Sequence, residues 1–307
     1  MTSGSTARSR IYSPRKKNPL SRAQRANALL WQPDPSQLGN TLKTPSGLRI
    51  RTMRMSRPRL AGRSLLFFSD AHIRTAGIRG YFPFIRQHGG TEWLTNAFRE
   101  LFETIPSPDC IVFGGDLVGD VAWMEPAIEF LRSFPAAPRK LAVCGNWELR
   151  RRWITPDRWR DIYARGGFEL LLNEPAEVDG IKFWGMDDAK EGDSLYAVPK
   201  IPAGTDCILA HNPDSAAAQL TAPLLEGSPL ILCGHTHGGQ CRLPGFGAVI
   251  TSSRFGKRFE YGAYRYAPTG AEMYVSAGIG ATWFHARILC PPEVLLINFC
   301  LTFGFRL

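Results

Sequence analysis

The stretch SLLFFSDAH, residues 64–72, decides the fold, because an apolar run ends abruptly in an acid and a histidine. A short, continuously apolar run is typical of a strand that is covered on both faces. The same order recurs four times along the chain: CIVF (110–113) before GGD, LAVC (141–144) before GNWE, CILA (207–210) before HNP, and LILC (230–233) before GHTH. Further apolar runs at 181–184, 273–275 and 294–297 predict additional strands.

Helical patterns lie between the early strands. Trp93, Ala97 and Leu101 recur at i, i+4 and i+8, and a second helix is opened by Thr155-Pro156-Asp157 and closed by Gly166-Gly167. Strands and helices alternate in the first half, and strands predominate afterwards. This order predicts an α/β fold, with two packed mixed β-sheets flanked by helices, over residues 46–307.

The composition favours a globular protein without a membrane span. The 307 residues are 44% hydrophobic and 21% charged, unlike a disordered chain. No apolar run reaches the roughly 18 residues of a spanning helix, and we see no signal-peptide core. The seven cysteines are an odd number scattered mostly in apolar runs, which suits buried free thiols. We therefore expect a cytoplasmic protein.

The positive charge is concentrated at the N-terminus. Residues 1–63 contain 14 Lys and Arg against one acid, a net charge of +13, whereas the remaining residues have 23 against 26, a net charge of −3. Residues 1–45 are predicted to form a basic, mostly disordered arm. Within it, Leu20, Ala23, Ala26 and Leu30 recur near helical spacing before Trp31, as in a short amphipathic helix for a membrane surface; a solvated arm is the alternative. Such an arm attracts anionic lipid or nucleic acid alike.

Polar side chains that follow the strands form one candidate metal site. Open α/β sheets place ligands at the carboxyl ends of their strands, so these segments are expected to converge. Asp, His and Asn donors suit Mn²⁺, Fe or Zn²⁺. The set is too large for one ion but right for two that share a carboxylate, and such a pair can clamp the attacking and leaving oxygens of a phosphoryl group. The candidates are Asp70, His72, Asp116, Asn146, His211, His235 and His237.

The order Asp-x-His, Gly-Asp, Gly-Asn-x-Glu, His and Gly-His-x-His resembles the calcineurin-like metallophosphoesterase superfamily over roughly residues 60–300. The resemblance implies a four-layer sandwich and two divalent ions, Mn²⁺ first, with Fe or Zn²⁺ as alternatives. It also implies that Asp116 bridges the ions. One ion would be held by Asp70, His72, Asp116 and His237, and the other by Asp116, Asn146, His211 and His235.

Longer strings narrow the resemblance. LAHNPD (209–214), GHTHGGQ (234–240) and CPPEVLLI (290–297) are similar to a bacterial branch of membrane-associated phosphohydrolases. Some members of that branch cleave the pyrophosphate of UDP-2,3-diacylglucosamine in lipid A biosynthesis. The resemblance thus implies a lipid-linked substrate and a peripheral position on the inner face of the membrane.

One residue departs from the family pattern. Trp147 stands where the family has a catalytic histidine, and an indole has no titratable proton near neutral pH. Trp147 therefore cannot act as a general acid. Such a loss is tolerable when the leaving group is already good. His285 is a candidate replacement for the acid, or a surface or core histidine. Arg74 and Arg150 are candidates for binding a substrate phosphate.

These features predict a metal-dependent hydrolase of a phosphodiester or pyrophosphate, with Asp116, Asn146, Trp147 and His285 as the catalytic candidates. Two alternatives stay open. The chain could be a nuclease or nucleotide phosphodiesterase whose arm holds nucleic acid, or a metal-binding relative without turnover because of Trp147. No protein partner can be predicted from the sequence.

Overall fold

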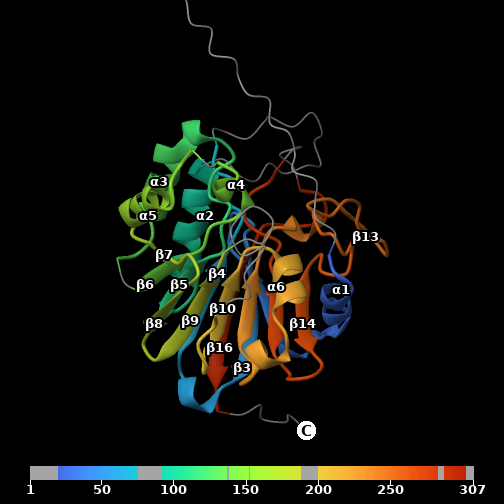
Figure 1. Cartoon of the computed structure of the whole chain (residues 1–307). Coiled ribbons are helices and arrows are strands. Elements are labelled where there is room, and N and C mark those ends of the chain that lie inside the picture. Colours follow the sequence, from blue (N-terminus) through green and yellow to red (C-terminus); the bar gives the residue numbers. More distant parts are fainter. Residues whose placement is uncertain are drawn as a thin grey trace, which may run out of the picture.

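Two seven-stranded mixed sheets face each other in the computed structural model (Figure 1), which describes residues 20–74, 91–136, 138–151, 153–187, 200–282 and 287–301. The first sheet has the order β1 (Trp31–Pro33), β14 (Gly262–Tyr266), β15 (Glu272–Val275), β11 (Leu230–Cys233), β10 (Cys207–Ala210), β9 (Ile181–Met186) and β8 (Glu174–Val178). The second has the order β2 (Leu38–Lys43), β3 (Arg49–Ser56), β16 (Glu293–Cys300), β4 (Ser64–Phe68), β5 (Cys110–Phe113), β6 (Arg139–Ala142) and β7 (Glu169–Leu170). A separate hairpin consists of β12 (Arg242–Leu243) and β13 (Gly247–Ala248).

Both sheets are mixed: the first has four parallel strands at its centre, and the second has four parallel strands that extend to its edge at β7. Strands β9, β10, β11 and β15 run parallel, as do β4 to β7, whereas β8, β14 and β1 pair antiparallel and β16 runs antiparallel to β4. The predicted fold class, α/β with two packed mixed sheets, is confirmed. The apolar runs at 110–113, 207–210 and 230–233 coincide with β5, β10 and β11.

Helices cover the outer face of each sheet. In Figure 1, α2, α3 and α5 lie over the second sheet, whereas α1 and α6 lie over the first. The α-helices are α1 (Arg22–Leu29), α2 (Thr91–Thr104), α3 (Met124–Arg132), α4 (Asn146–Leu149), α5 (Pro156–Arg165) and α6 (Pro213–Gln219). Short 3-10 helices are η1 (Pro35–Gln37), η2 (Pro58–Leu60), η3 (Val121–Trp123), η5 (Ala222–Leu225) and η6 (His237–Gly239).

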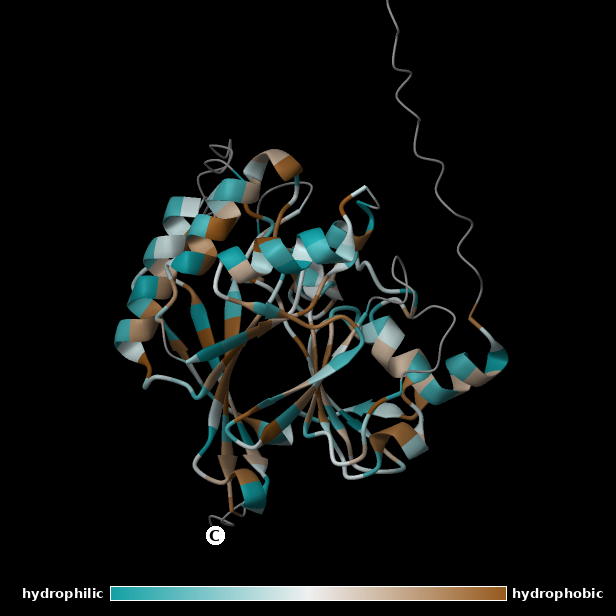
Figure 2. Cartoon of the chain, turned by 60° about the vertical axis from the view of Figure 1, so that its left-hand side comes forward, coloured by the Kyte–Doolittle hydropathy of each residue, from teal (hydrophilic) through white to brown (hydrophobic). Residues whose placement is uncertain are grey.

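The apolar side chains of β4 explain the layered core. Leu66 and Phe68 pack toward α2 and α3, and Leu65 and Phe67 pack toward the facing sheet, so alternate residues enter two separate cores. A third core lies between the first sheet and α6. Figure 2 shows the resulting pattern, with brown strands at the centre and helices that alternate between brown and teal. The chain therefore folds as four layers, and a strand with two buried faces must be continuously apolar.

Part of the predicted N-terminal arm belongs to this fold. Residues 22–43 form α1, β1, η1 and β2, so the expectation of a mostly disordered arm to residue 45 is wrong for this part; residues 1–19 lie outside the described residues. Ser21 caps α1 through a capping box with Gln24. Asn27 donates hydrogen bonds to the carbonyls of Ala217 at 2.9 Å and Leu220 at 2.8 Å, which joins α1 to α6.

Trp31 anchors the same segment to the first sheet. Its side chain is fully buried, its ring centre lies 5.0 Å from that of Tyr266, and β1 pairs with β14. Trp31 therefore cannot enter a membrane as the amphipathic reading of the arm requires, although Leu29 and Leu30 are exposed. None of the helices in the described ranges has both the length and the apolar character to cross a bilayer.

Replacing Trp31 should destabilise the whole domain. We expect Trp31→Ala to lower the free energy of unfolding by about 3–5 kcal/mol, because a large cavity would open between α1 and the sheet. Leu29→Ala is the matched control, since Leu29 is exposed, and should cost less than about 0.5 kcal/mol. Chemical denaturation measures both free energies of unfolding. If Trp31→Ala cost as little as Leu29→Ala, the segment would not be part of the cooperative fold.

Candidate metal centre

Side chains that follow the carboxyl ends of five strands, from both sheets, converge on one place. Each set follows its strand directly: Asp70 and His72 after β4, Asp116 after β5, Asn146 after β6, His211 after β10, and His235 and His237 after β11. All seven side chains are buried. Parallel strands end at one edge of a sheet, so the alternation of strands and helices brings together residues up to 167 positions apart.

The donor atoms form two groups. Asp70, His72 and His237 make one and Asp116, His211 and His235 the other, with the donor atoms of each group within 4.8 Å of one another. In the first group the Nε2 atoms of His72 and His237 lie 3.2 Å apart, and Asp70 Oδ1 lies 3.5 Å from His237 Nε2. The partition follows the division of ligands that the sequence resemblance implies.

Asp116 connects the two groups through a single oxygen. Its Oδ2 lies 3.5 Å from His72 Nε2 and 3.3 Å from His211 Nε2. Its Oδ1 accepts a hydrogen bond of 2.8 Å from the backbone N–H of Trp147, which fixes the carboxylate plane. One carboxylate oxygen thus faces donors of both groups, the arrangement needed for a shared ligand.

Hydrogen bonds to the imidazole rings define which nitrogen faces the centre. Nδ1 of His211 lies 2.7 Å from the carbonyl oxygen of Gly114; a carbonyl only accepts, so this nitrogen carries a proton, and Nε2 is the nitrogen that faces Asp116. A ring oriented by a backbone carbonyl is a common arrangement for a metal-binding histidine. In the second group Asn146 Oδ1 lies 2.7 Å from Nδ1 of His235.

Burial acts in opposite senses on the two kinds of donor: it favours the neutral form of an imidazole, which can bind a cation, and disfavours the charged form of a carboxylate. It lowers the pKa of His72 to about 4, so this ring is neutral near pH 7. It also raises the pKa of Asp70 to about 6. For Asp116 burial acts in the same direction, but the neighbouring His211 outweighs it and lowers the pKa. Imidazole nitrogens and carboxylate oxygens are donors that divalent metal ions take, and the residues present fit two such ions.

The backbone at the centre is strained. Asp70, His72, Asp116, His235 and His237 all have positive φ angles, between 43° and 71°. They are five of the ten non-glycine residues with this conformation in the described chain. Left-handed backbone costs free energy for residues with a Cβ and concentrates at functional sites. The tight turns aim successive side chains of one loop at the same point.

Two motif glycines allow the carboxylates to approach neighbouring backbone. A Cβ atom on Gly145 would lie 2.2 Å from Asp116 Oδ1, and one on Gly234 would lie 2.4 Å from Asp70 Oδ2. Both positions exclude any side chain, since such distances are far below van der Waals contact. The glycines of Gly-Asn and Gly-His are therefore required by the packing of the ligands.

Glu148 holds the loops beneath the centre. It is completely buried, and its carboxylate accepts hydrogen bonds from the backbone N–H groups of Asp116 at 3.0 Å, Leu117 at 2.6 Å and Gly145 at 2.8 Å. Sequence reasoning quoted Glu148 as part of a motif but missed this role. The available signal was an acid just after the loop that carries Asn146.

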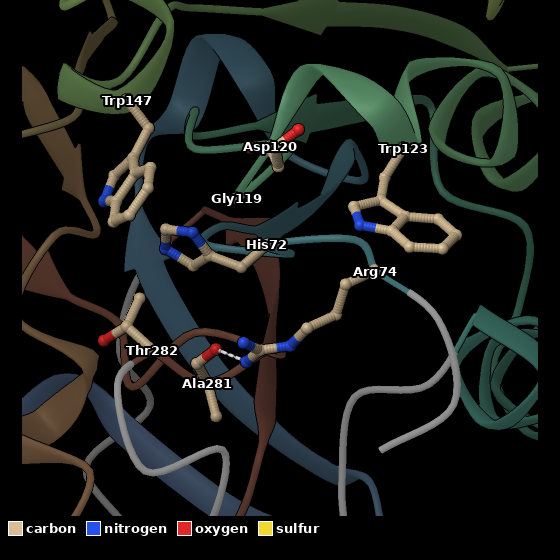
Figure 3. Close-up of a pocket in the computed structure, with 8 residues that line it drawn as sticks. All are labelled: His72, Arg74, Gly119, Asp120, Trp123, Trp147, Ala281 and Thr282. Carbon is tan, nitrogen blue, oxygen red and sulfur yellow. Dashed lines mark hydrogen bonds between the residues drawn. The ribbon is translucent and has the colours of Figure 1, made fainter. Parts of the chain in front are cut away.

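A pocket of about 260 Å³ opens beside His72. Figure 3 shows Trp147 and Trp123 on opposite sides of it, with His72 between them and the Arg74 guanidinium donating to the carbonyl oxygen of Ala281. The rings of His72 and Trp147 meet edge to face, with centres 5.4 Å apart. The described lining is His72, Arg74, Gly119, Asp120, Trp123, Trp147, Ala281 and Thr282. Nothing in the sequence had pointed to Trp123.

Two guanidinium groups contact the indole ring of Trp147. The guanidinium carbons of Arg150 and Arg151 lie 5.5 Å and 5.7 Å from its ring centre. Arg151 also donates to the carbonyl oxygens of Trp147 and Gly119. Arg150, predicted to bind substrate, is absent from the described lining of the pocket, whereas Arg74 is part of it. His285 lies outside the described residues.

Comparison with known proteins agrees with the geometry. Residues 63–239 match the model of the family described as calcineurin-like phosphoesterase, which covers more than half of the chain. The chain belongs to this metallophosphoesterase family.

Curated relatives of the chain are also named as phosphoesterases. The chain is 29% identical over 248 residues to the uncharacterized metallophosphoesterase YkuE of Bacillus subtilis, covering 77% of this chain and 79% of that protein. It is 36% identical over 203 residues to the phosphodiesterase YaeI of Escherichia coli, covering 62% and 70%. Among solved structures, a 5'-nucleotidase precursor from Thermus thermophilus aligns with a TM-score of 0.46 at 12% identity, over 77% of this chain and 54% of that one.

Replacing the Glu148 carboxylate by an amide should destabilise the loops that carry the metal-binding side chains. A glutamine has one acceptor oxygen and would direct N–H groups at a backbone donor, so we expect Glu148→Gln to lower the free energy of unfolding by about 1–3 kcal/mol. Glu103→Gln, at an exposed position of α2, is the control and should have little effect. Denaturant titration compares them. If the two variants unfolded alike, Glu148 would not hold these loops.

Proposed function

We propose that this metallophosphoesterase hydrolyses phosphodiesters or diphosphates with two divalent metal ions, Mn²⁺ in the first instance. The ligands would be Asp70, His72, Asp116 and His237 for one ion and Asp116, Asn146, His211 and His235 for the other. When bound, such ions supply the Lewis acidity that activates water and neutralises charge on phosphoryl oxygens.

The observation that carries this proposal is the position of Asp116. One oxygen of this buried carboxylate lies within 3.5 Å of imidazole nitrogens from both groups. A single ion would leave part of this set without a role, and a purely structural hydrogen-bond network would not need imidazole nitrogens of both groups to face one oxygen. The family membership and the relatives named as phosphoesterases support the same reaction class.

Trp147 restricts the leaving groups that the site can use. The indole contacts His72 and walls the pocket, but it cannot give a proton to a departing alkoxide. Substrates whose leaving oxygen is already stabilised, such as an aryl oxide or a nucleotide phosphate, avoid this requirement. We therefore propose that turnover favours activated diesters and diphosphates over simple alkyl esters.

Arg74 is proposed to face the substrate phosphate. It is half-buried, lines the pocket next to His72, and is held by its hydrogen bond to Ala281. A guanidinium keeps its charge and offers paired donors, which suits a phosphoryl group. Arg150, stacked on Trp147, would instead act as a positioning residue for the indole.

A lipid-linked diphosphate, such as UDP-2,3-diacylglucosamine, is the finer substrate proposal. It rests on the resemblance of the strings 209–214, 234–240 and 290–297. Soluble nucleotide diesters and nucleic acid are the competing substrates. A panel of all three, with products read by mass spectrometry, ranks them by rate.

Neutralising Asp116 should remove both metal and activity. With the Mn²⁺-loaded chain and an activated aryl phosphodiester, we expect Asp116→Asn to reduce kcat/KM at least about a hundredfold, because the shared charge between the two groups is lost. Elemental analysis should give two ions per wild-type chain and fewer in the variant.

Asp157→Asn is the matched control. The side chain of Asp157 is 95% exposed on α5, and it belongs neither to the described pocket lining nor to either donor group. Its activity should stay near wild type. A chain that binds two ions yet hydrolyses no substrate of the panel would instead be the non-catalytic relative.

Restoring a proton donor at position 147 should widen the substrate range. We expect Trp147→His to raise hydrolysis of an unactivated alkyl diester about tenfold or more, while the aryl diester changes little, because only the alkoxide needs protonation. Trp147→Phe, which keeps an aromatic ring without a titratable proton, should show no such gain. An equal change for both substrates would mean that residue 147 acts through packing alone.

A further inference from the structure

Exposed apolar side chains gather in two segments beside the metal centre. Twelve large apolar side chains are exposed in the described parts of the chain, and six of them lie in residues 243–250 and 288–289. We name this set the apolar rim: Leu243, Phe246, Val249, Ile250, Ile288 and Leu289. Single exposed apolar residues are ordinary, but a cluster of this kind marks an interaction surface.

Backbone hydrogen bonds hold the two segments side by side. The N–H of Val249 donates to the carbonyl of Cys241 at 3.0 Å, which closes the β12–β13 hairpin. The N–H of Arg242 donates to the carbonyl of Ile288 at 2.9 Å, and the N–H of Ile288 donates to the carbonyl of Gln240 at 3.0 Å. Leu289 also has a φ of 50° while two-thirds of its side chain is exposed, an expensive conformation for a leucine on the surface.

The rim is attached directly to the loop that carries His237. A Cβ atom on Gly239 would lie 2.1 Å from the Cβ of Ala248, so β13 packs against η6 without space for a side chain. Gln240 continues this loop and donates to the carbonyl of Thr282 at 2.8 Å, at the edge of the pocket. A surface that covers the rim would therefore lie next to the metal centre.

Basic side chains accompany the rim. Lys257 places its ammonium nitrogen 3.0 Å from the centre of the Phe246 ring. Arg258 donates to the carbonyl oxygens of Leu29 at 2.9 Å and Trp31 at 2.7 Å, beside the exposed end of α1. Residues 240–260 contain four basic side chains, Arg242, Arg254, Lys257 and Arg258, and one acid, Glu260.

Two carboxylates on this side of the described chain, Glu260 and Asp214, are engaged within the fold. Glu260 forms an ion pair of 2.8 Å with Arg242, and Asp214 accepts from Ser253 at 2.6 Å and from the backbone of Arg254. The face is thus apolar and cationic together. This combination matches an anionic bilayer, where apolar side chains enter the interface and basic groups meet the headgroups.

We propose that the apolar rim docks the chain on an anionic phospholipid surface. Docking would present the metal centre to phosphate esters at the level of the headgroups, which deepens the proposed function. Vesicle binding itself does not depend on hydrolysis. The predicted membrane contact is thereby moved from Trp31, which is buried, to the β12–β13 hairpin and residues 288–289.

Binding of the full chain to vesicles tests the proposal. The probes are sedimented vesicles of phosphatidylcholine alone and of phosphatidylcholine mixed with phosphatidylglycerol. We expect binding to the mixed vesicles, and a loss of about tenfold in the partition coefficient for each of Phe246→Asp and Ile250→Asp. Leu42→Asp is the matched control, because Leu42 is 49% exposed on β2, an edge strand of the second sheet, and the change adds the same charge.

Each other result overturns the proposal. Equal losses for Leu42→Asp and the rim variants would indicate a general charge effect. Binding that survives in the rim variants but disappears when residues 1–19 are removed would assign it to that segment. A dimer in sedimentation equilibrium that the rim variants dissociate would make the rim a subunit interface. Hydrolysis of a soluble aryl diester should stay unchanged in the rim variants, so failure of docking is distinguishable from failure of the proposed function.

Discussion

The carboxylate of Asp116 is the group on which the rest of the centre depends. It is buried, and a buried charge is costly unless it is paired and hydrogen-bonded. Its two oxygens have separate partners: Oδ2 faces imidazoles from both groups, and Oδ1 accepts from the backbone at Trp147. The N–H of Asp116 is in turn held by Glu148. Any displacement of this one side chain would therefore disturb both groups together.

The packing between the sheets gives that carboxylate its fixed surroundings. One sheet supplies Asp70, His72, Asp116 and Asn146, and the other supplies His211, His235 and His237. The shared core of residues such as Phe67, Leu209 and Leu232 sets the distance between the two sheet edges. Because close-packed cores transmit small displacements rather than absorb them, the geometry of the centre is a property of the inter-sheet core.

The sequence was most informative where one physical cause determined the pattern. Strands β5, β10 and β11 are buried on both faces, so each is a continuous apolar run whose end can be recognised in the sequence. The polar residues that follow were therefore expected to meet at the carboxyl ends of the strands. Residues 20–45 lacked this signal. Their place depends on Asn27 and Trp31, whose partners lie about two hundred residues away, and local composition contains no trace of such contacts. Trp123 enters the pocket through tertiary packing alone, and Glu148 acts on backbone groups that no motif displays.

In the proposed function, Trp147 and the apolar rim together restrict the substrates that the centre can use. The indole is fixed by its backbone bond to Asp116, by the edge of His72 and by two guanidinium groups, so it is a rigid wall. Because the indole has no titratable proton, the proposed reaction needs a leaving group that is stable without protonation. A diphosphate linkage meets that requirement without help from the protein. On the proposed docking, such a linkage at a lipid headgroup would also reach the centre from the face on which the rim lies, which is why the two proposals support the same substrate class.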